Sequence, residues 1–136
     1  MKYLADKSAL ERQRHSAGAR AIIATLLAEN ALASSHISAM EVLYSARNRD
    51  EYRRQRVSEN GLSWLPVDEV AMDRALEVQG LLAERGQHRL PIPDLLLAAT
   101  AERHDATVLH YDKDFDLIAG VTGQPTRWIT PRPRTS

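Results

Sequence analysis

The 136-residue sequence has no cysteine and no apolar run that approaches the roughly 18 residues of a membrane-spanning helix. Without cysteine the chain can form no disulfide bond, thiol nucleophile or thiolate metal site, which fits a reducing compartment. The first ten residues, MKYLADKSAL, lack the long apolar core of a signal peptide. We therefore expect a soluble protein of the cytoplasm.

The sequence also lacks an excess of charge of one sign, because 18 lysines and arginines balance 18 aspartates and glutamates. No overall field therefore favours a nucleic acid or a membrane, and such a partner would have to be met by local groups. Aromatic residues make up only 5%, and we expect Trp64 and Trp128 to be packing residues. The length fits one domain, which we place at residues 1–130, and we expect the Pro-rich tail at 131–136 to be disordered.

What the sequence does contain is a regular alternation of strand and helix patterns. Short apolar runs predict strands at residues 3–5, 31–34, 62–67, 107–109 and 127–129. Helical spacing of apolar or charged residues predicts helices around residues 19–27, 39–46, 48–60, 71–82 and 95–101. Strands that alternate with helices predict a single α/β domain with a mainly parallel central sheet of four to five strands, flanked by helices.

Four acidic residues follow the predicted strands or open the helices after them. Asp6 follows the first strand, and Glu41 lies in the helix after the second. Asp94 opens a helix that is apolar nearly all round, and Asp112 follows the fourth strand. Because open α/β sheets place their ligands outside the carboxyl ends of the strands, we expect these four carboxylates to converge at one edge.

Each acid taken alone also has a structural explanation, as a cap or a turn residue. Ser38 and Glu41 match the spacing of a capping box, and Asp94 in a first helical turn complements the helix dipole. Asp6 fits a turn at the end of a strand, before a helix that Ser8 would cap.

The four acids together are harder to explain as caps, although Asp112 likewise fits the cap of the short helix after it. Carboxylates about 5 Å apart at an effective dielectric near 20 repel by roughly 3 kcal/mol per pair, so protonation or a cation must relieve the cluster. Oxygen ligands without cysteine or a paired histidine motif favour the hard ions Mg²⁺ or Mn²⁺, which orient water and phosphate for in-line displacement. The remaining candidate ligands are scattered, and we assign no role to His36, His88, His104 and His110.

These residues resemble the PIN domain family, and in particular the VapC-type toxin ribonucleases of bacterial toxin–antitoxin modules. The resemblance covers nearly the whole chain and rests on four segments in a fixed order: YLADKSAL at 3–10, ISAMEV at 37–42, IPDLLLAATA at 92–101 and VLHYDKDF at 108–115. The chain departs from the family pattern at Lys7, where members often have threonine directly after the first aspartate.

The resemblance implies a catalytic quartet that also binds Mg²⁺, made of Asp6, Glu41, Asp94 and Asp112. Of these, Asp6 and Asp94 would chiefly hold the metal, with Ser8 as a polar support. Members differ in which acid of the final turn reaches the metal, so Asp114 is a second candidate beside Asp112. The resemblance further implies a homodimer and an antitoxin of the VapB type that wraps the toxin and blocks its cleft.

We therefore predict a Mg²⁺-dependent endoribonuclease, the toxin of a toxin–antitoxin pair, that hydrolyses RNA phosphodiester bonds with a metal-activated water. Met40 and Tyr44 lie off the core stripe of their helix, and we expect them to form an exposed surface where an antitoxin docks. One alternative is a catalytically silent PIN-like binding module. A more distant one is a receiver-type phosphoacceptor domain, which needs an acidic pair where this chain has Asp6-Lys7. The RNA backbone would be met by basic groups such as Arg12, Arg14, Arg47 and Arg49.

Overall fold

Five short strands form one sheet in the order β3-β2-β1-β4-β5 in the computed structural model, which describes residues 1–134. Every neighbouring pair of strands is parallel. The strands are β1 (Tyr3–Ala5), β2 (Leu32–Ser34), β3 (Ser63–Trp64), β4 (Thr107–His110) and β5 (Thr126–Trp128). The predicted α/β domain with a parallel central sheet is confirmed.

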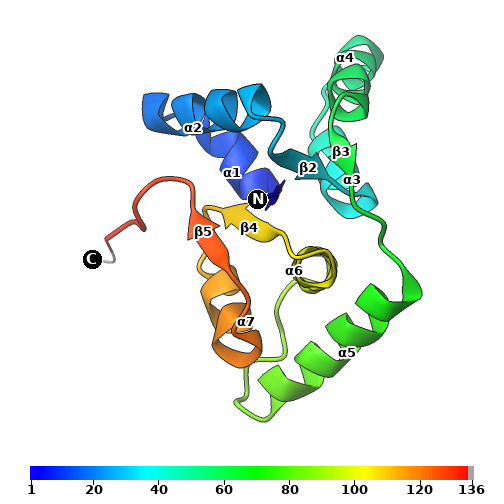
Figure 1. Ribbon diagram of the computed structural model, residues 1–136, viewed down its shortest axis with the longest axis vertical. Helices are drawn as coiled ribbons and strands as arrows, with labels where there is room; N and C mark the ends of the chain where they lie inside the picture. The colour runs from blue at the N-terminus through cyan, green and yellow to red at the C-terminus, as the bar shows by residue number, and fades with distance from the viewer. Residues whose placement is uncertain (135–136) are drawn as a thin grey trace.

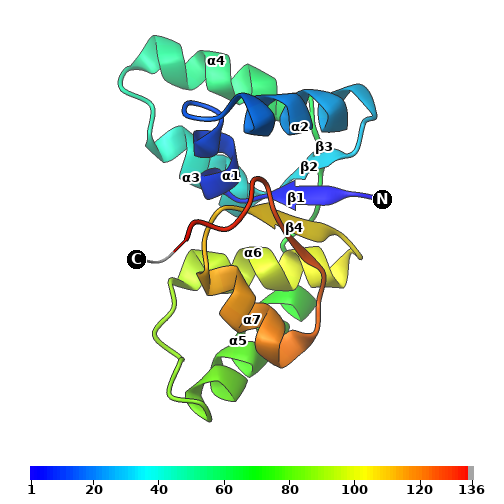
Figure 2. The same cartoon turned by 90° about the vertical axis from the view of Figure 1, so that its left-hand side faces the viewer.

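Seven helices connect and cover these strands. They are α1 (Lys7–Arg12), α2 (Ala17–Ala28), α3 (His36–Tyr44), α4 (Arg49–Asn60), α5 (Glu69–Ala83), α6 (Ile92–Arg103) and α7 (Asp114–Thr122). Helices α1 and α2 cover one face of the sheet, α5 to α7 cover the other, and α3 and α4 pack together beside β2 and β3 (Figure 1, Figure 2). Within residues 1–134, no helix has the length and apolar character of a membrane span.

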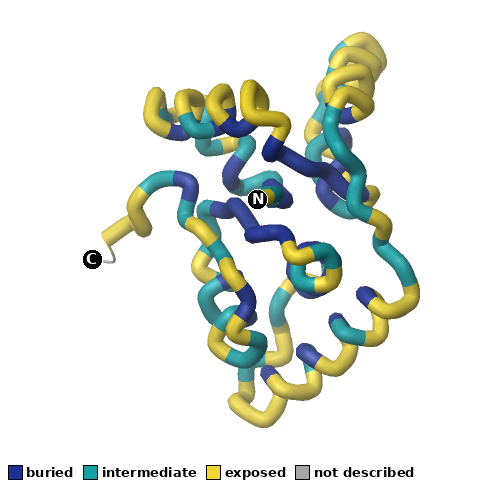
Figure 3. The backbone as a smooth tube through the Cα atoms, viewed as in Figure 1, coloured by how far each residue is buried: buried dark blue, intermediate teal, exposed yellow. Residues whose placement is uncertain are grey.

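The sheet separates two hydrophobic cores because successive residues of a strand point to opposite faces. Leu4 and Val108 belong to the core formed with α5, α6 and α7, whereas their neighbours Ala5 and Leu109 belong to the core formed with α1 and α2. Figure 3 shows the resulting run of buried backbone through the central strands. Burial on both faces explains why the central strands read as continuous apolar runs.

The first predicted helix begins earlier than expected and is divided into two. Its cap is Asp6, which accepts a hydrogen bond from the backbone N–H of Ser8, so the prediction of Ser8 as the cap is wrong. The helical stripe that starts at Ala19 belongs to a separate helix, capped by Ser16. The physical reason is that an aspartate at the end of β1 satisfies the free N–H groups of the next turn directly.

Helix α3 also begins one position after a cap, Ser35, that the sequence pattern did not predict. Ser35 accepts from the backbone N–H of Ser38, and the Ser38 hydroxyl accepts from the backbone N–H of Ser35. Ser38 is thus the third residue of a capping box, and the proposed box of Ser38 with Glu41 is wrong. The carboxylate of Glu41 takes no part in this cap and is available for other contacts.

The third strand is shorter than the predicted run at residues 62–67. Leu65 still donates its backbone N–H to the carbonyl oxygen of Ser34, but Pro66 follows and has no N–H to continue the ladder. At the other end of the chain, Arg132 lies 3.2 Å from a carboxylate oxygen of Asp116. That contact falls inside the tail predicted at 131–136, of which residues 135–136 lie outside the described part.

Candidate active site

Three carboxyl groups meet at the carboxyl edge of the sheet. Asp94 lies in the first turn of α6, Asp112 follows β4 by two residues, and Asp114 is the first residue of α7. Each of the three offers a carboxylate oxygen, and these oxygens all lie within 4.8 Å of one another. The convergence of Asp94 with Asp112 is the predicted one, and the second candidate Asp114 joins them.

Asp6 is buried beside this cluster and is held by a short hydrogen-bond network. Its Oδ2 atom accepts from the backbone N–H of Ser8 at 3.0 Å and from the Ser8 hydroxyl at 2.6 Å. The same hydroxyl accepts from the backbone N–H of Tyr111 at 2.9 Å. Ser8 therefore ties the start of α1 to the loop after β4, and so fixes the position of Asp6 relative to Asp112.

The pKa of Asp94 is raised to about 7, first by burial and then by the negative charges of four nearby carboxylates: Asp6, Asp112, Asp114 and Glu41. Burial also raises the pKa of Asp6, against the lowering effect of its hydrogen bonds with Ser8. Burial and the charge of Asp112 raise the pKa of Asp114. The charges of all five acids therefore influence one another, although it is Asp94, Asp112 and Asp114 whose oxygens all lie within 4.8 Å of one another.

Glu41 faces the site from α3 but stands apart from the close cluster. Its Oε2 atom lies 3.4 Å from the Nζ atom of Lys7, the residue directly after Asp6. The ammonium group of Lys7 therefore offsets the charge of one of the five acids. The sequence showed Lys7 where the family often has threonine, but no sequence pattern predicted that Lys7 would pair with Glu41.

The donor atoms of the cluster suit a hard divalent cation. Carboxylate oxygens are the ligands that Mg²⁺ prefers, and two opposite ligands of Mg²⁺ are about 4.2 Å apart. The oxygens of Asp94, Asp112 and Asp114 all lie within 4.8 Å of one another, slightly more than this largest separation, so small side-chain rotations would bring all three to one ion. A cation would also relieve the repulsion that raises the pKa of Asp94.

His110 is a buried residue that supports the loop carrying Asp112, although the sequence predicted no role for it. It is fully buried between Phe115 and Trp128, and burial lowers its pKa to about 4. Its Nδ1 atom accepts the backbone N–H of Asp112 at 3.2 Å. Asp112 in turn accepts the backbone N–H of Asp114 at 2.9 Å, so a neutral histidine helps to hold both acids in place.

A shallow apolar hollow of about 320 Å³ adjoins the acids on the α3 side. Met40 and Tyr44 line it and are 60% and 88% exposed, as expected from their position off the core stripe. Glu41 and Lys7 form its polar margin, and Pro93 connects it to the start of α6. An apolar surface thus borders Glu41 and Lys7 at the margin of the site.

The chain is similar in sequence and in fold to known proteins. A model of the PIN domain family matches residues 7–121. Ribonuclease VapC51 of Mycobacterium tuberculosis (strain ATCC 25618 / H37Rv) is 46% identical over 131 residues, which cover 96% of this chain and 95% of VapC51. The structure of VapBC-1 from nontypeable Haemophilus influenzae has a TM-score of 0.77 at 19% identity, and the match covers 96% of this chain and 100% of that one.

A second solved structure is VapBC-5 from Mycobacterium tuberculosis, a member of the VapBC family of toxin-antitoxin systems. Its TM-score is 0.56 at 25% identity, and the match covers 70% of this chain and 79% of that one. The likeness to the Haemophilus structure shows a shared fold, whereas the identity to VapC51 extends along nearly the whole sequence.

Proposed function

This chain belongs to the PIN domain family as a VapC-type endoribonuclease, and from that premise we propose that its acidic cluster uses Mg²⁺ to hydrolyse RNA phosphodiester bonds. Mn²⁺, which accepts the same oxygen ligands, is the expected substitute. The observation that carries this proposal is the meeting of the oxygens of Asp94, Asp112 and Asp114 within 4.8 Å. The buried Asp6 beside them adds a fourth carboxylate.

Each side chain has a distinct part in the proposed reaction. Asp94, Asp112 and Asp114 would hold the cation, and Asp6 would complete the negative wall of the site from the position that Ser8 gives it. A bound Mg²⁺ would supply Lewis-acid polarisation of a phosphate oxygen and a lower pKa for water. In the proposed step, water attacks phosphorus while the bond from phosphorus to the leaving ribose oxygen breaks. Glu41 would accept the proton that water loses, and the leaving oxygen would take a proton from solvent.

The decisive experiment compares Asp94→Asn with Asp73→Asn, a matched change on the exposed face of α5. We expect Asp94→Asn to abolish Mg²⁺-dependent cleavage of RNA while the protein stays folded, since removing one of several like charges relieves repulsion. Asp73→Asn should cleave like the parent protein. Asp6→Asn should behave like Asp94→Asn. Full cleavage by Asp94→Asn would contradict the assignment, and RNA binding without cleavage by the parent protein would favour a silent binding module.

We propose that the physiological partner is a VapB-type antitoxin. The similarity to VapBC-5, a member of a toxin–antitoxin family, supports this proposal, as does the apolar hollow at Met40 and Tyr44 beside the acids. An antitoxin segment that places apolar side chains in this hollow would bring its own basic group within reach of the carboxylates. Co-purification with the small protein encoded directly upstream tests the pairing.

A homodimer is also proposed, with α5 and α6 as its contact surface. Met72, Leu76 and Ile92 are 48%, 69% and 63% exposed and line one apolar hollow of about 240 Å³. Exposed apolar surface of this kind is typical of subunit contacts. Light scattering on the purified protein would give the mass directly, and Leu76→Asp should shift a dimer towards the monomer.

A further inference from the structure

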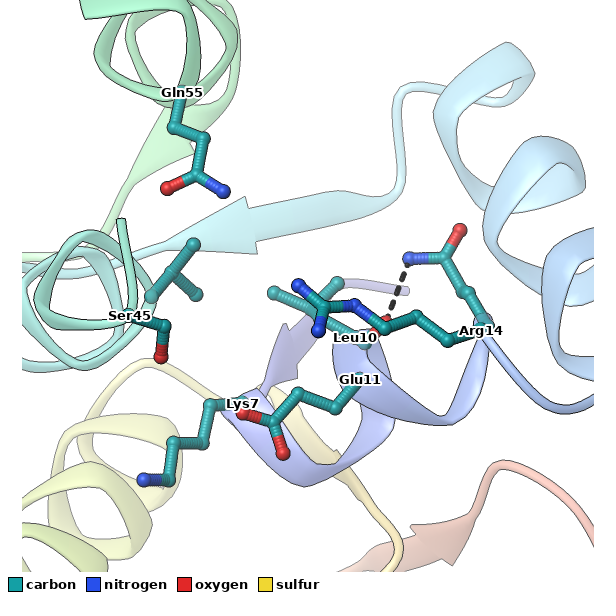
Figure 4. A pocket seen from close by; sticks show the side chains of 8 residues that line it. Lys7, Leu10, Glu11, Arg14, Ser45 and Gln55 are labelled. Atoms are coloured by element: carbon teal, nitrogen blue, oxygen red, sulfur yellow. Dashed lines mark hydrogen bonds between the residues drawn. The ribbon is translucent and has the colours of Figure 1, made fainter. Parts of the chain in front are cut away.

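Lys7 stands between two hollows of different chemistry. On one side is the apolar hollow with Met40 and Tyr44. On the other side is a hollow of about 230 Å³ between α1, the end of α3 and α4. Figure 4 shows that its walls carry polar groups from all three helices. They are Glu11 and Arg14 of α1 and the turn after it, Ser45 at the end of α3 and Gln55 of α4.

Gln55 supplies a second, independent observation in this hollow, a buried polar atom. Its Oε1 atom is buried, and it has no hydrogen-bond partner among the described residues. Figure 4 shows the amide of Gln55 projecting from α4 towards the space shared with Arg14 and Ser45. A buried acceptor without a donor is unfavourable, so a ligand that brings an N–H group into the hollow would gain a hydrogen bond that no described residue supplies.

Lys7 connects this hollow to the acidic cluster. Its side chain lines the hollow, while its Nζ atom points away from the other labelled side chains (Figure 4). This Nζ atom lies 3.4 Å from Oε2 of Glu41. The side chain is 42% exposed, so the ammonium group is open to a ligand that approaches from solvent. A phosphate at the acidic cluster would therefore meet a cation on the side that leads towards the second hollow.

We propose that this second hollow is a nucleotide-binding subsite for the RNA substrate, joined to the cleavage site by Lys7. The proposal rests on the ribonuclease function proposed above. A phosphate oxygen of the bound RNA takes the place of Glu41 beside the ammonium group of Lys7. The neighbouring base enters the hollow, where Gln55 accepts a hydrogen bond from its amino or imino group. The release of Glu41 from Lys7 coincides with substrate binding, so the carboxylate becomes free when water must be deprotonated.

The chemistry of the two hollows favours RNA over a protein segment as the occupant of the second one. An apolar docking surface suits protein anchors and is found on the Met40 side. The second hollow instead combines the guanidinium of Arg14, the hydroxyl of Ser45 and the free amide acceptor of Gln55 with an apolar wall from Leu10 and Val42, and Lys7 lies at its margin. Such a mixture suits the base edge of a nucleotide whose phosphate lies outside, beside Lys7. Glu11 faces the same space, and its charge excludes a second phosphate from the depth of the hollow.

The role of Lys7 is tested by the salt dependence of RNA binding. We would measure binding of a short single-stranded RNA by fluorescence anisotropy, with Asp94→Asn as the uncleaving background. Adding Lys7→Met should weaken binding by about tenfold, as expected for a hydrogen bond to a charged group. It should also reduce the slope of log affinity against log salt by roughly 0.7, the loss of one phosphate contact. Lys2→Met, at the opposite edge of the sheet, should change neither value.

The role of Gln55 is tested by cleavage of an RNA pool in which the bases around the cut site vary. Gln55→Leu should reduce the base preference at one position beside the cut by about fivefold, the worth of one hydrogen bond. Its melting temperature should equal or exceed that of the parent protein, because the change removes a buried acceptor that has no partner. Gln87→Leu is the matched control in a distant loop. Arg14→Met, a change at an exposed residue, probes the same hollow if Gln55→Leu fails to fold.

The outcomes separate this inference from the proposed function. If the parent protein cleaves RNA and Asp94→Asn does not, while the changes at Lys7, Gln55 and Arg14 alter neither salt slope nor base preference, the subsite is wrong and the ribonuclease assignment stands. If those changes instead weaken only inhibition by the antitoxin, the hollow is a protein docking site and the inference is overturned. If the parent protein cleaves no RNA with Mg²⁺, the function itself fails.

Discussion

Asp94 is a buried carboxyl group that faces four other acids without a cation of its own. It is 9% exposed, and its pKa of about 7 results first from burial and then from those neighbours. In the unfolded chain the same group has an ordinary pKa near 4. The folded protein therefore binds a proton at Asp94 more tightly than the unfolded chain does, and this difference links stability to pH.

We predict that, in EDTA, Asp94 makes the protein less stable as the pH rises. Below pH 4 the group is protonated in both states, and the penalty is absent. Between pH 4 and about 7 the unfolded chain releases the proton while the folded state retains it, so stability falls through this window and levels off above it. A shift of this size corresponds to a loss on the order of 4 kcal/mol.

The measurement is the difference in unfolding free energy between Asp94→Asn and the parent protein from urea titrations at several pH values. This difference should grow in favour of the Asp94→Asn variant from pH 4 to 7 and then stay constant. His110 has the opposite effect between pH 4 and 6.5, because its pKa is lowered to about 4, but it is present in both proteins and cancels. A difference that does not vary with pH would show that Asp94 titrates normally.

At the scale of elements, the short helices α1 and α3 contribute different features to the surroundings of the acids. Helix α1 begins at Lys7 and is capped by Asp6, so the cap that starts the helix is also one of the acids at the sheet edge. Helix α3 is closed at its start by Ser35 and Ser38, which leaves its outer face free of capping contacts. That outer face carries Met40 and Tyr44, the exposed apolar residues that line the hollow beside the acidic cluster.

We predict that the double change Met40→Asp with Tyr44→Asp weakens inhibition by the antitoxin more than it weakens RNA cleavage. Two new charges would stand where apolar anchors are expected to dock, whereas the acids at the sheet edge are unchanged. The loss of affinity should be at least about tenfold, and cleavage should change by less than about threefold. Inhibition is titrated at fixed toxin concentration and compared with the parent protein.

A matched control is the pair Tyr52→Asp with Val57→Asp, which are exposed on α4. This control should be inhibited like the parent protein. Equal inhibition of the Met40 and Tyr44 double variant, with its fold confirmed by circular dichroism, would show that the antitoxin docks elsewhere.

At the scale of the whole molecule, the parallel sheet is the reason that distant acids meet. Carboxyl ends of parallel strands lie at one edge, and β1 and β4 are neighbours in the sheet although about a hundred residues separate them. Hydrophobic cores on both faces hold this arrangement rigid. The energy of those cores keeps the repelling carboxylates together, so relief of the repulsion should stabilise the entire fold.

We therefore predict that Mg²⁺ or Mn²⁺ raises the melting temperature. A cation that binds only the folded acidic site stabilises by mass action, by about 2.7 kcal/mol at a hundredfold excess over Kd. For a domain of this size, that gain corresponds to a rise of several degrees. Differential scanning fluorimetry with and without EDTA provides the measurement. The shift should disappear in Asp112→Asn and persist in Asp73→Asn, and identical melting with and without EDTA would count against a metal site.

The sequence by itself determined the class of fold and the identity of most of the acids. Periodicity showed where strands and helices alternate, and this alternation requires a parallel sheet with an edge that gathers ligands. Asp6, Asp94 and Asp112 follow from their places at strand ends and at the mouth of a buried helix. The positions of helix starts were less predictable, because Asp6 and Ser35 compete with nearby serines that have equal capping ability.

Only the tertiary structure decided which side chains touch. Asp114 joins Asp94 and Asp112 within 4.8 Å, whereas Glu41 turns to Lys7 instead. Such choices depend on side-chain directions and on distances between segments far apart in sequence, and neither periodicity nor composition encodes them. The unpaired Oε1 atom of Gln55 likewise could not be predicted from the sequence. Whether an acceptor is buried depends on how the surrounding helices pack around it.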